Sequence, residues 1–437
     1  MARAGGSEPV DAPVARGPVV GELRPPGSKS LTQRWLLLAA LAEGTSTIEN
    51  ALRSDDVEAL TGGLRTLGAT VRWTGADSIE VRGVGGRVPG GGRLDAHEGG
   101  TPARFLMAAA AMATRASVLD GSARLRKRPM SDGVQLLAAL GAGARRSTSD
   151  ELPLEIAPSA EFRRGGEIEI DAPASSQFLS AVALVAPWME RGLRVRVRGE
   201  APSASYVELT VQCLRELGVE AHWEGGELRV QAGPPRAFTV RVEPDASSAA
   251  YGFALAAIQP GSCVRAPGLC ADSRQPDMAV LRALVALGAR DASDAGGAAV
   301  AHGRALGGGE FDASLWPDGS LAVMAAAATA SAPVTLRGLG TLAAKESDRI
   351  DAMRAWLVAV GASVERGNDW IRVRGPLGGG DVVEVDPRRD HRVAMSAAVV
   401  GAVRGGVRVM DPRCVDKSWP GFWAAWAELL GPRPASP

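Results

Sequence analysis

The sequence predicts an α/β protein with two globular halves, each containing three copies of one mixed unit. The main observation is a helical phrase that ends in an apolar residue and a glycine and recurs six times. Glycine after the last apolar turn is the usual left-handed terminator of a helix. These glycines lie 73, 77, 70, 73 and 70 residues apart, at Gly68, Gly141, Gly218, Gly288, Gly361 and Gly431. A period near seventy is too long for an ordinary solenoid, which favours two halves of three units.

A second signature precedes each terminator: a small or charged polar cluster that opens an apolar helix. Stretches typical of strands separate and follow the helices, such as 45–48, 70–73 with 78–82, and 334–337. One unit therefore reads strand, helix, strand, helix, strand, strand. The six clusters are Ser28–Ser30, Gly99–Thr101, Ser175–Gln177, Asp245–Ser248, Asp318–Ser320 and Asp390–Arg392.

These clusters also have chemical content, because a helix N-terminus carries unpaired amides and a partial positive charge that attract anions. Five of the clusters have a cation within or near them, and for these we favour contact with a ligand. For Asp245–Ser248, which has no basic neighbour in sequence, simple capping of the helix is the favoured interpretation.

Composition limits the function classes. Formal net charge is zero, so broad attraction to nucleic acid or to an anionic membrane is not expected. The apolar stretches are too short to span a membrane. The four cysteines show no CxxC spacing and read as buried, reduced thiols, and no histidine cluster suggests a metal. We expect a soluble, cytoplasmic protein without a cofactor, preceded by a disordered extension over residues 1–18 and no signal peptide.

Lysine is rare in this chain. Only four of the 49 basic residues are lysine, and each lies in a dense polar motif: Lys29, Lys127, Lys345 and Lys417. Lysine is a compact point charge that can lose its proton, whereas guanidinium is planar and always charged. Their placement suggests one site that gathers an anionic substrate.

Seven motifs, in this order and spacing, resemble those of the 5-enolpyruvylshikimate-3-phosphate synthase family of enolpyruvyl transferases. The resemblance runs from about residue 19 to 430. No motif is decisive alone, but the series together with the sixfold repeat is specific. The motifs are Pro26–Arg34, Gly99–Arg104, Arg124–Pro129, Ser175–Gln177, Lys345–Arg349, Asp390–Arg392 and Asp411–Pro420.

The resemblance implies a fold and a reaction. The fold is a two-domain inside-out α/β barrel with six βαβαββ repeats and the active site in the cleft between domains. One domain holds residues 28–243 and the other combines 1–27 with 244–437. The implied reaction moves the carboxyvinyl group of phosphoenolpyruvate to the 5-hydroxyl of shikimate 3-phosphate by addition and elimination. It belongs to the shikimate pathway of aromatic amino-acid biosynthesis, needs no metal or organic cofactor, and is expected of a monomer.

The resemblance also implies roles for individual residues. Asp318, Glu346 and Lys29 are the expected catalytic residues, with Asp318 the candidate base and the division of proton transfers left open. Shikimate 3-phosphate is expected at Lys29, Ser30, Arg34, Ser175, Ser176, Gln177, Ser203, Tyr206, Asp318, Thr341 and Lys345. Phosphoenolpyruvate is expected at Lys29, Gly100, Arg128, Gln177, Arg349, Arg392 and Lys417.

Other residues near these motifs have plainer interpretations. We expect rim charges at Arg124, Arg126 and Lys127, a positioning role for His391, and core positions for Trp419 and Trp423. Arg104 stays open between a ligand contact and a structural pair. Five positions depart from the commoner family pattern and bear on affinity: Gln33, Glu98, Ala204, Thr341 and Ala343.

Three alternative functions remain at this point. A UDP-N-acetylglucosamine 1-carboxyvinyltransferase shares the fold, but typically has a cysteine in the loop that here spans residues 111–127, where none occurs. A paralogue acting on another cyclic hydroxy acid is supported only by the departures above. A non-catalytic anion-binding protein is disfavoured, because anion binding gains nothing from acids such as Asp318 and Glu346.

Overall fold

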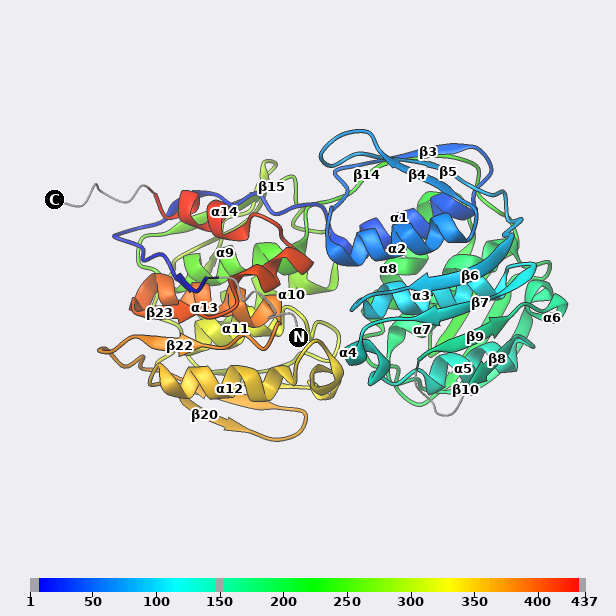
Figure 1. Cartoon of the computed structure of the whole chain (residues 1–437). Helices are drawn as coiled ribbons and strands as arrows, with labels where there is room; N and C mark the ends of the chain where they lie inside the picture. Colours follow the sequence, from blue (N-terminus) through cyan, green and yellow to red (C-terminus); the bar gives the residue numbers. More distant parts are fainter. Residues whose placement is uncertain (1–7, 147–151, 432–437) are drawn as a thin grey trace. The chain divides into compact units, whose positions relative to one another are not determined.

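The computed structural model describes residues 8–146 and 152–431. Within them the chain forms two compact units. Unit 1 takes the chain up to Pro26 and again from Pro244 onward, and unit 2 is Gly27–Glu243. The chain therefore passes from one unit to the other twice (Figure 1).

Unit 2 contains three four-stranded sheets of one pattern, in which a parallel pair is followed by two antiparallel neighbours. Their orders are β14-β3-β5-β4, β6-β7-β9-β8 and β10-β11-β13-β12. The strands are β3 (Thr45–Glu49), β4 (Thr70–Trp73), β5 (Ile79–Arg82), β6 (Gly90–Asp95), β7 (Arg115–Asp120), β8 (Gly143–Arg146), β9 (Leu154–Ala157), β10 (Gly166–Asp171), β11 (Leu193–Arg198), β12 (Ala221–Glu224), β13 (Glu227–Val230) and β14 (Thr239–Arg241).

The helices of unit 2 alternate with these strands. They are α1 (Lys29–Leu41), α2 (Asp55–Thr66), α3 (Gly100–Ala111), α4 (Ala123–Arg126), α5 (Ser131–Ala139), α6 (Ala160–Arg164), α7 (Ser176–Val185), the short η1 (Ala186–Trp188) and α8 (Ser205–Glu216). In α1, α3 and α7 nearly every residue is buried. These three helices therefore form the centre of the unit, and the sheets lie around them (Figure 1).

Unit 1 repeats the pattern in two four-stranded sheets, β16-β17-β15-β2 and β18-β19-β21-β20, and has a shorter third sheet, β1-β23-β22. The strands are β1 (Val10–Asp11), β2 (Val20–Glu22), β15 (Cys263–Pro267), β16 (Arg290–Asp291), β17 (Gly297–Ala301), β18 (Gly309–Asp312), β19 (Val334–Arg337), β20 (Ser363–Arg366), β21 (Ile371–Arg374), β22 (Val383–Val385) and β23 (Val407–Val409).

The central helices of unit 1 are α9 (Ala246–Ile258), α11 (Ser320–Ala327) and α13 (His391–Arg404), again almost wholly buried. Their many alanines permit close packing, since a small side chain lets backbones approach. Around them lie the short η2 (Pro276–Met278), α10 (Ala279–Leu287), η3 (Gly340–Ala344), α12 (Arg349–Ala359), η4 (Pro412–Lys417) and α14 (Phe422–Leu429).

Two strands exchange places between the repeats. β2 precedes α1 in sequence but pairs in parallel with β15 of unit 1, and β14 precedes α9 but pairs in parallel with β3 of unit 2. Each time the chain crosses, the strand just before the crossing stays in the unit that the chain leaves: β2 stays in unit 1 and β14 in unit 2. The expected βαβαββ unit is confirmed in five repeats, with this exchange. In the described part of the sixth repeat the sheet has three strands, of which β1 is one.

The sequence signals for helix ends are confirmed. All six terminator glycines have positive φ, between 78° and 133°, where a side chain would be strained. All six polar clusters lie at the start of a central helix. The mixed α/β class and the six repeats therefore follow from the sequence as predicted.

Two expectations need correction. The disordered extension was expected over 1–18, but residues 8–18 belong to the fold, because Val10 and Asp11 pair with β23 and Ala12 is buried; residues 1–7 lie outside the described part. All four cysteines are free, but only Cys213 is buried as expected: Cys263 and Cys414 are half-buried and Cys270 is exposed. Trp419 is buried and packs edge-on against Phe422, as expected of a core residue. No helix in the described ranges is long and apolar enough to cross a membrane.

Candidate functional site: two half-sites

The central helices of unit 2 begin close together. Lys29, the first residue of α1, donates to Asp56 in the first turn of α2 at 3.1 Å. A Cβ built on Gly99, just before α3, would lie 3.1 Å from the same Asp56 carboxylate. Arg104 of α3 donates to Gln177 of α7 at 2.9 Å. Four helix N-termini thus meet at one face of unit 2, which defines the first half-site.

An ion pair fixes the side chain of Lys29, which nevertheless remains partly exposed to solvent. Its side chain is 15% exposed and that of Asp56 is 6% exposed. A partly desolvated ion pair fixes the ammonium group more firmly than a surface pair does, because solvent screens it less. The expected catalytic lysine therefore has a defined position at the start of α1.

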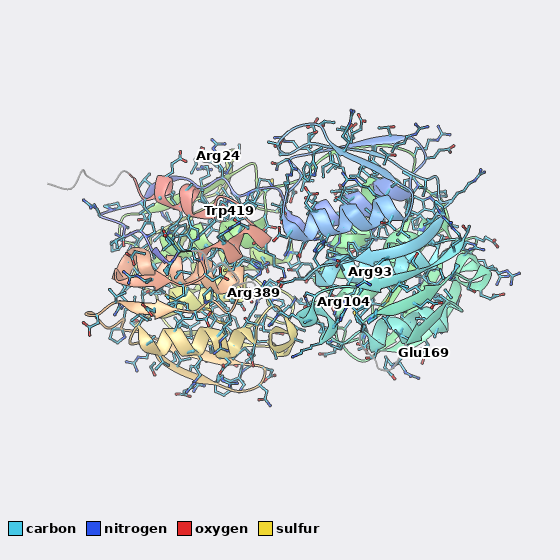
Figure 2. The ribbon with its side chains drawn as sticks, viewed as in Figure 1. Arg24, Arg93, Arg104, Glu169, Arg389 and Trp419 are labelled. Carbon is cyan, nitrogen blue, oxygen red and sulfur yellow. The ribbon has the colours of Figure 1, made fainter. Side chains whose placement is uncertain are left out.

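Gln177 is fixed by two partners on α3. Its amide oxygen accepts from Arg104, and its amide nitrogen donates to Thr101 at 3.0 Å. The guanidinium of Arg104, which lies on α3 (Figure 2), also sits 4.7 Å over the ring of Phe178. Arg104 is 3% exposed, so the structure places it as a buried link between α3 and α7 that orients Gln177.

Gly100 lies against two guanidinium groups. A Cβ built there would be 2.4 Å from Nη1 of Arg128 and 2.8 Å from Nη1 of Arg104. The Nε of Arg128 is buried and has no hydrogen-bond partner among the described residues. The absence of a side chain at Gly100 therefore allows Arg128 to approach the start of α3 with donors available for an anion.

Arg34 joins three helices. Its guanidinium donates to Ser30 in α1, to Thr210 and the Tyr206 carbonyl in α8, each at 2.8 Å, and to Ser180 in α7 at 3.4 Å. Burial lowers the pKa of this group from its ordinary value. Arg34 was expected to hold shikimate 3-phosphate directly; the structure adds that it ties α1 to α7 and α8.

The expected phosphate-binding serines lie at the starts of α7 and α8. Ser175 caps α7 by accepting from the Gln177 amide, and Ser176 is the buried first residue of that helix. Ser203 is also buried and takes a left-handed conformation, φ 55°, just ahead of α8, where Tyr206 is half-buried. Because Ser180 bonds to the Tyr206 carbonyl, these two helix starts are neighbours.

The basic residues before Pro129 have different surroundings in the structure. Arg124 and Lys127 are exposed, as expected of rim charges. Arg126 instead pairs with buried Asp120 at 2.7 Å, and its hydrogen bonds hold the pKa of that carboxyl below its ordinary value. The Arg126 side chain is 43% exposed, so it is a surface charge, as expected, that also serves as a structural partner of Asp120.

In unit 1 a second half-site forms around Arg349, the first residue of α12. This side chain is 1% exposed and pairs with three carboxylates, Asp318 at 2.7 Å, Glu346 at 2.8 Å and Asp390 at 2.8 Å. Burial lowers the pKa of the guanidinium, but the three carboxylates outweigh it and raise the pKa. Arg349 is the hub that brings the two expected catalytic acids together.

Asp318 lies at the turn before α11 and meets two further cations. Lys345 is 3.4 Å away and Arg392 of α13 is 3.3 Å away. Burial by itself raises the pKa of Asp318, but Lys345, Arg392 and Arg349 together lower it well below the ordinary value. Without substrates, Asp318 is therefore a carboxylate held firmly ionised.

Glu346 completes the cluster by reaching Lys417. The ammonium group of Lys417, at the end of η4, lies 3.2 Å from Glu346 and is 9% exposed. His391 is buried at the start of α13 beside Asp390, which caps that helix. Thr341 of η3 has a buried hydroxyl without a hydrogen-bond partner among the described residues. Three of the four lysines thus belong to the half-sites, and Lys127 does not.

Some residues of the half-sites were not predicted from the sequence. Asp56 and Thr210 act through partners far away in the chain, and no local pattern identifies those partners. Asp277 is a third such residue: it is 2% exposed and accepts a hydrogen bond from the turn that carries Asp318. In the described part of the chain, no group of three or more His, Cys, Asp or Glu residues is arranged to hold a metal ion.

Comparison with known proteins gives consistent likenesses. Residues 14–426 match the family EPSP synthase (3-phosphoshikimate 1-carboxyvinyltransferase). The chain is 37% identical to the 3-phosphoshikimate 1-carboxyvinyltransferase of Methanoculleus marisnigri over 94% of this chain and 96% of the relative. It is 38% identical to the protein of that name from Thiobacillus denitrificans, with the same coverage.

Solved structures agree with the fold. EPSP synthase from Acinetobacter baumannii superposes with a TM-score of 0.79 at 25% identity, covering 97% of this chain and 98% of that one. The enolpyruvyl transferase NikO from Streptomyces tendae shares the fold, with a TM-score of 0.73 at 19% identity over 97% and 98% of the chains.

The fold of three-repeat units and the two charged half-sites, taken with these likenesses, define an enolpyruvyl transferase. Within that class, the chain belongs to the EPSP synthase (3-phosphoshikimate 1-carboxyvinyltransferase) family.

Proposed function

We propose that this protein transfers the carboxyvinyl group of phosphoenolpyruvate to the 5-hydroxyl of shikimate 3-phosphate and releases phosphate, a step of aromatic amino-acid biosynthesis. The observation that carries the proposal is the cluster in unit 1, where two acids suited to proton transfer, Asp318 and Glu346, lie among four cations. A site that only bound anions would be weakened by such acids. Family membership supports the same reaction.

The half-site of unit 2 suits shikimate 3-phosphate. Ser175, Ser176 and Ser203 place hydroxyl and amide donors at the starts of α7 and α8, and helix N-termini favour a dianionic phosphate. Lys29 supplies a cation at the start of α1, and Tyr206 of α8 supplies an aromatic ring to pack beside the ring of the substrate. Ser30, Arg34 and Gln177 set the positions of these groups through the bonds described above.

The phosphoenolpyruvate contacts draw on arginines that can bind a carboxylate or phosphate in a bidentate way. In unit 2, Arg128 lies beside Gly100 with its Nε available. In unit 1, Arg349, Arg392 and Lys417 supply the charge, each already paired with a carboxylate. The anionic substrate therefore competes with, or adds to, these carboxylates as ligands of the same cations.

That competition bears on proton transfer. In the addition step the 5-hydroxyl gives its proton to a base, its oxygen joins C2 of phosphoenolpyruvate, and C3 takes a proton from an acid. Elimination then breaks the bond from C2 to the phosphate oxygen and releases phosphate, as C3 gives a proton back to a base. Free Asp318 is too weak a base for this chemistry, because three cations lower its pKa. When bound phosphoenolpyruvate shares Arg349 and Arg392, the pKa of Asp318 rises toward the range useful to a general base.

Lys345 and Thr341 complete the proposal on the side of the acceptor. Lys345 pairs with Asp318, so both can meet the shikimate hydroxyls, and the Thr341 hydroxyl is available as a donor. We also propose that the protein is cytoplasmic and monomeric. Light scattering on the purified protein measures its molar mass and thereby tests the monomeric state.

The test is release of inorganic phosphate by purified protein. We expect release only when both phosphoenolpyruvate and shikimate 3-phosphate are present, with formation of the enolpyruvyl product by mass spectrometry. Turnover with UDP-N-acetylglucosamine, and none with shikimate 3-phosphate, would instead assign the chain to the rival activity. Phosphate release from phosphoenolpyruvate alone would indicate a phosphatase.

A further inference from the structure

Asp277 of η2 is buried behind the half-site of unit 1 and touches two of its helix starts. Its carboxylate accepts the amide of Gly319 at 3.0 Å and the hydroxyl of Ser247, and its side chain is almost completely excluded from solvent. Gly319 follows Asp318 directly and precedes the first residue of α11. A Cβ on Gly319 would lie 3.0 Å from the Asp277 carboxylate, so the turn is packed tightly against it. Asp277 is therefore in direct contact with the turn that carries Asp318.

Asp277 also feels the charges of the half-site. The main ones among the described residues are Arg392 from α13 and Asp318 from the turn before α11, while α9 contributes the uncharged hydroxyl of Ser247. Burial, and then the charge of Asp318, raise the pKa of Asp277 to about 6, against the opposing effects of Arg392, Ser247 and the Gly319 amide. A proton can therefore bind this carboxylate near neutral pH.

The protonation of Asp277 changes the net charge of the half-site of unit 1. With Asp277 ionised, the acids and the cations of the half-site are equal in number, and protonation of Asp277 leaves one uncompensated positive charge. The cations are Lys345, Arg349, Arg392 and Lys417, and the acids are Asp277, Asp318, Glu346 and Asp390.

We propose that Asp277 is a positioning residue that fixes the Asp318 turn through Gly319 and whose charge reduces the attraction of Arg392 for phosphoenolpyruvate. The inference rests on the proposed function for its substrate. It extends the half-site to the start of α9, where sequence indicated only a cap: Asp245 does cap that helix, at 2.8 Å from the Ser248 amide, but Ser247 is joined to the site through Asp277.

Two substitutions separate the two effects of Asp277. Asp277→Asn keeps an oxygen that can accept from Gly319 but removes the charge. We expect a KM for phosphoenolpyruvate about threefold lower or more at pH 7.5, because one negative charge near the anion is gone. At pH 5 wild type is itself protonated at Asp277, so the two KM values should converge. Titration of the substrate phosphate is common to both proteins and cancels in their ratio.

Asp277→Ala removes the acceptor as well. The Gly319 amide then has no partner from residue 277, and the Asp318 turn is free to shift. We expect kcat to fall roughly tenfold or more, because small misplacements of a reacting group lower the rate by such factors.

Ser247→Ala removes a hydrogen bond that lowers the pKa of Asp277, so the pH at which the KM values converge should move upward. Asp291→Asn is the matched control: Asp291 of β16 also accepts a backbone amide, from Ser293 at 2.9 Å, but is exposed. It should leave both constants unchanged.

Thermal unfolding tests Asp277 independently of catalysis. A folded-state pKa above the unfolded value of about 3.9 means that wild type loses stability as pH rises through the folded pKa. The melting temperature of Asp277→Asn relative to wild type should therefore rise between pH 5 and pH 7. If wild type shows no turnover, the proposed function fails while this readout still decides the titration of Asp277.

A KM ratio of Asp277→Asn to wild type that is the same at pH 5 and pH 7.5 would overturn the charge effect. Unchanged kcat in a folded Asp277→Ala would overturn the positioning effect. If Asp277→Ala does not fold, Asp277→Glu serves as the test variant in its place. The longer glutamate side chain keeps the charge but displaces the carboxylate from Gly319. A wild-type kcat in Asp277→Glu would likewise refute the positioning role.

Discussion

The pairing of Arg349 with three carboxylates predicts a large loss of stability when its charge is removed. In Arg349→Met, a side chain of similar length fills the space while Asp318, Glu346 and Asp390 lose a partner at 2.7 to 2.8 Å. Removing one member of a buried ion pair typically costs about 3–5 kcal/mol. Because Arg349 is 1% exposed and Asp390 is fully buried, we expect the upper part of that range. Urea unfolding at pH 7.5, followed by circular dichroism and tryptophan fluorescence, measures the loss.

The matched control is Arg337→Met in the same unit. Arg337 pairs with Glu310, and both side chains are about half exposed. Exposed pairs contribute at most about 1 kcal/mol, so this variant should unfold close to wild type. If Arg349→Met loses no more free energy of unfolding than Arg337→Met, the buried hub does not stabilise unit 1 and the reasoning is refuted.

The same comparison has a pH dependence whose sign is fixed. The pKa of Asp318 is lowered in the folded protein, so its contribution to stability is present above the unfolded pKa and is lost as pH falls through the folded value. Arg349 is one of three cations that lower that pKa. The difference between wild type and Arg349→Met should therefore shrink as pH falls below about 4, where the unfolded carboxyl becomes protonated.

Three further predictions concern activity. Lys29→Ala should keep the fold and less than a tenth of wild-type turnover, because the ammonium group that Asp56 positions is lost; a variant with more activity shows that Lys29 is peripheral. Gly100→Ala should raise the KM for phosphoenolpyruvate several-fold or more, since its methyl would meet Arg128; an unchanged KM refutes this contact. Gln177→Leu should lower turnover about as much as Arg104→Met, and the double variant should cost less than the two single effects added, because the residues act through one bond; additive effects contradict that link.

Much of the fold was predictable because its signals are local. A terminator glycine such as Gly68 or Gly361 must have positive φ wherever the helix lies, so the sixfold period could be read directly. The polar clusters were predictable for a similar reason, since the start of a helix needs donors or acceptors at fixed positions. The exchange of β2 and β14 did not follow from local signals, because strand pairing depends on partners more than 190 residues away. Only the family resemblance, which joins residues 1–27 to 244–437, implied it.

The sequence by itself determined the repeat, the helix starts, the cations that the half-sites use and, through the motifs, the family. Only the tertiary structure decided which acids face those cations: Asp56 beside Lys29, Asp390 beside Arg349 and Asp277 behind Asp318. It also showed that Arg104 is a buried link between α3 and α7 and that Arg126 is tied to the buried Asp120. The physical reason is that the sign and strength of a charge interaction depend on distance and burial, which arise when helix starts from different repeats are packed together.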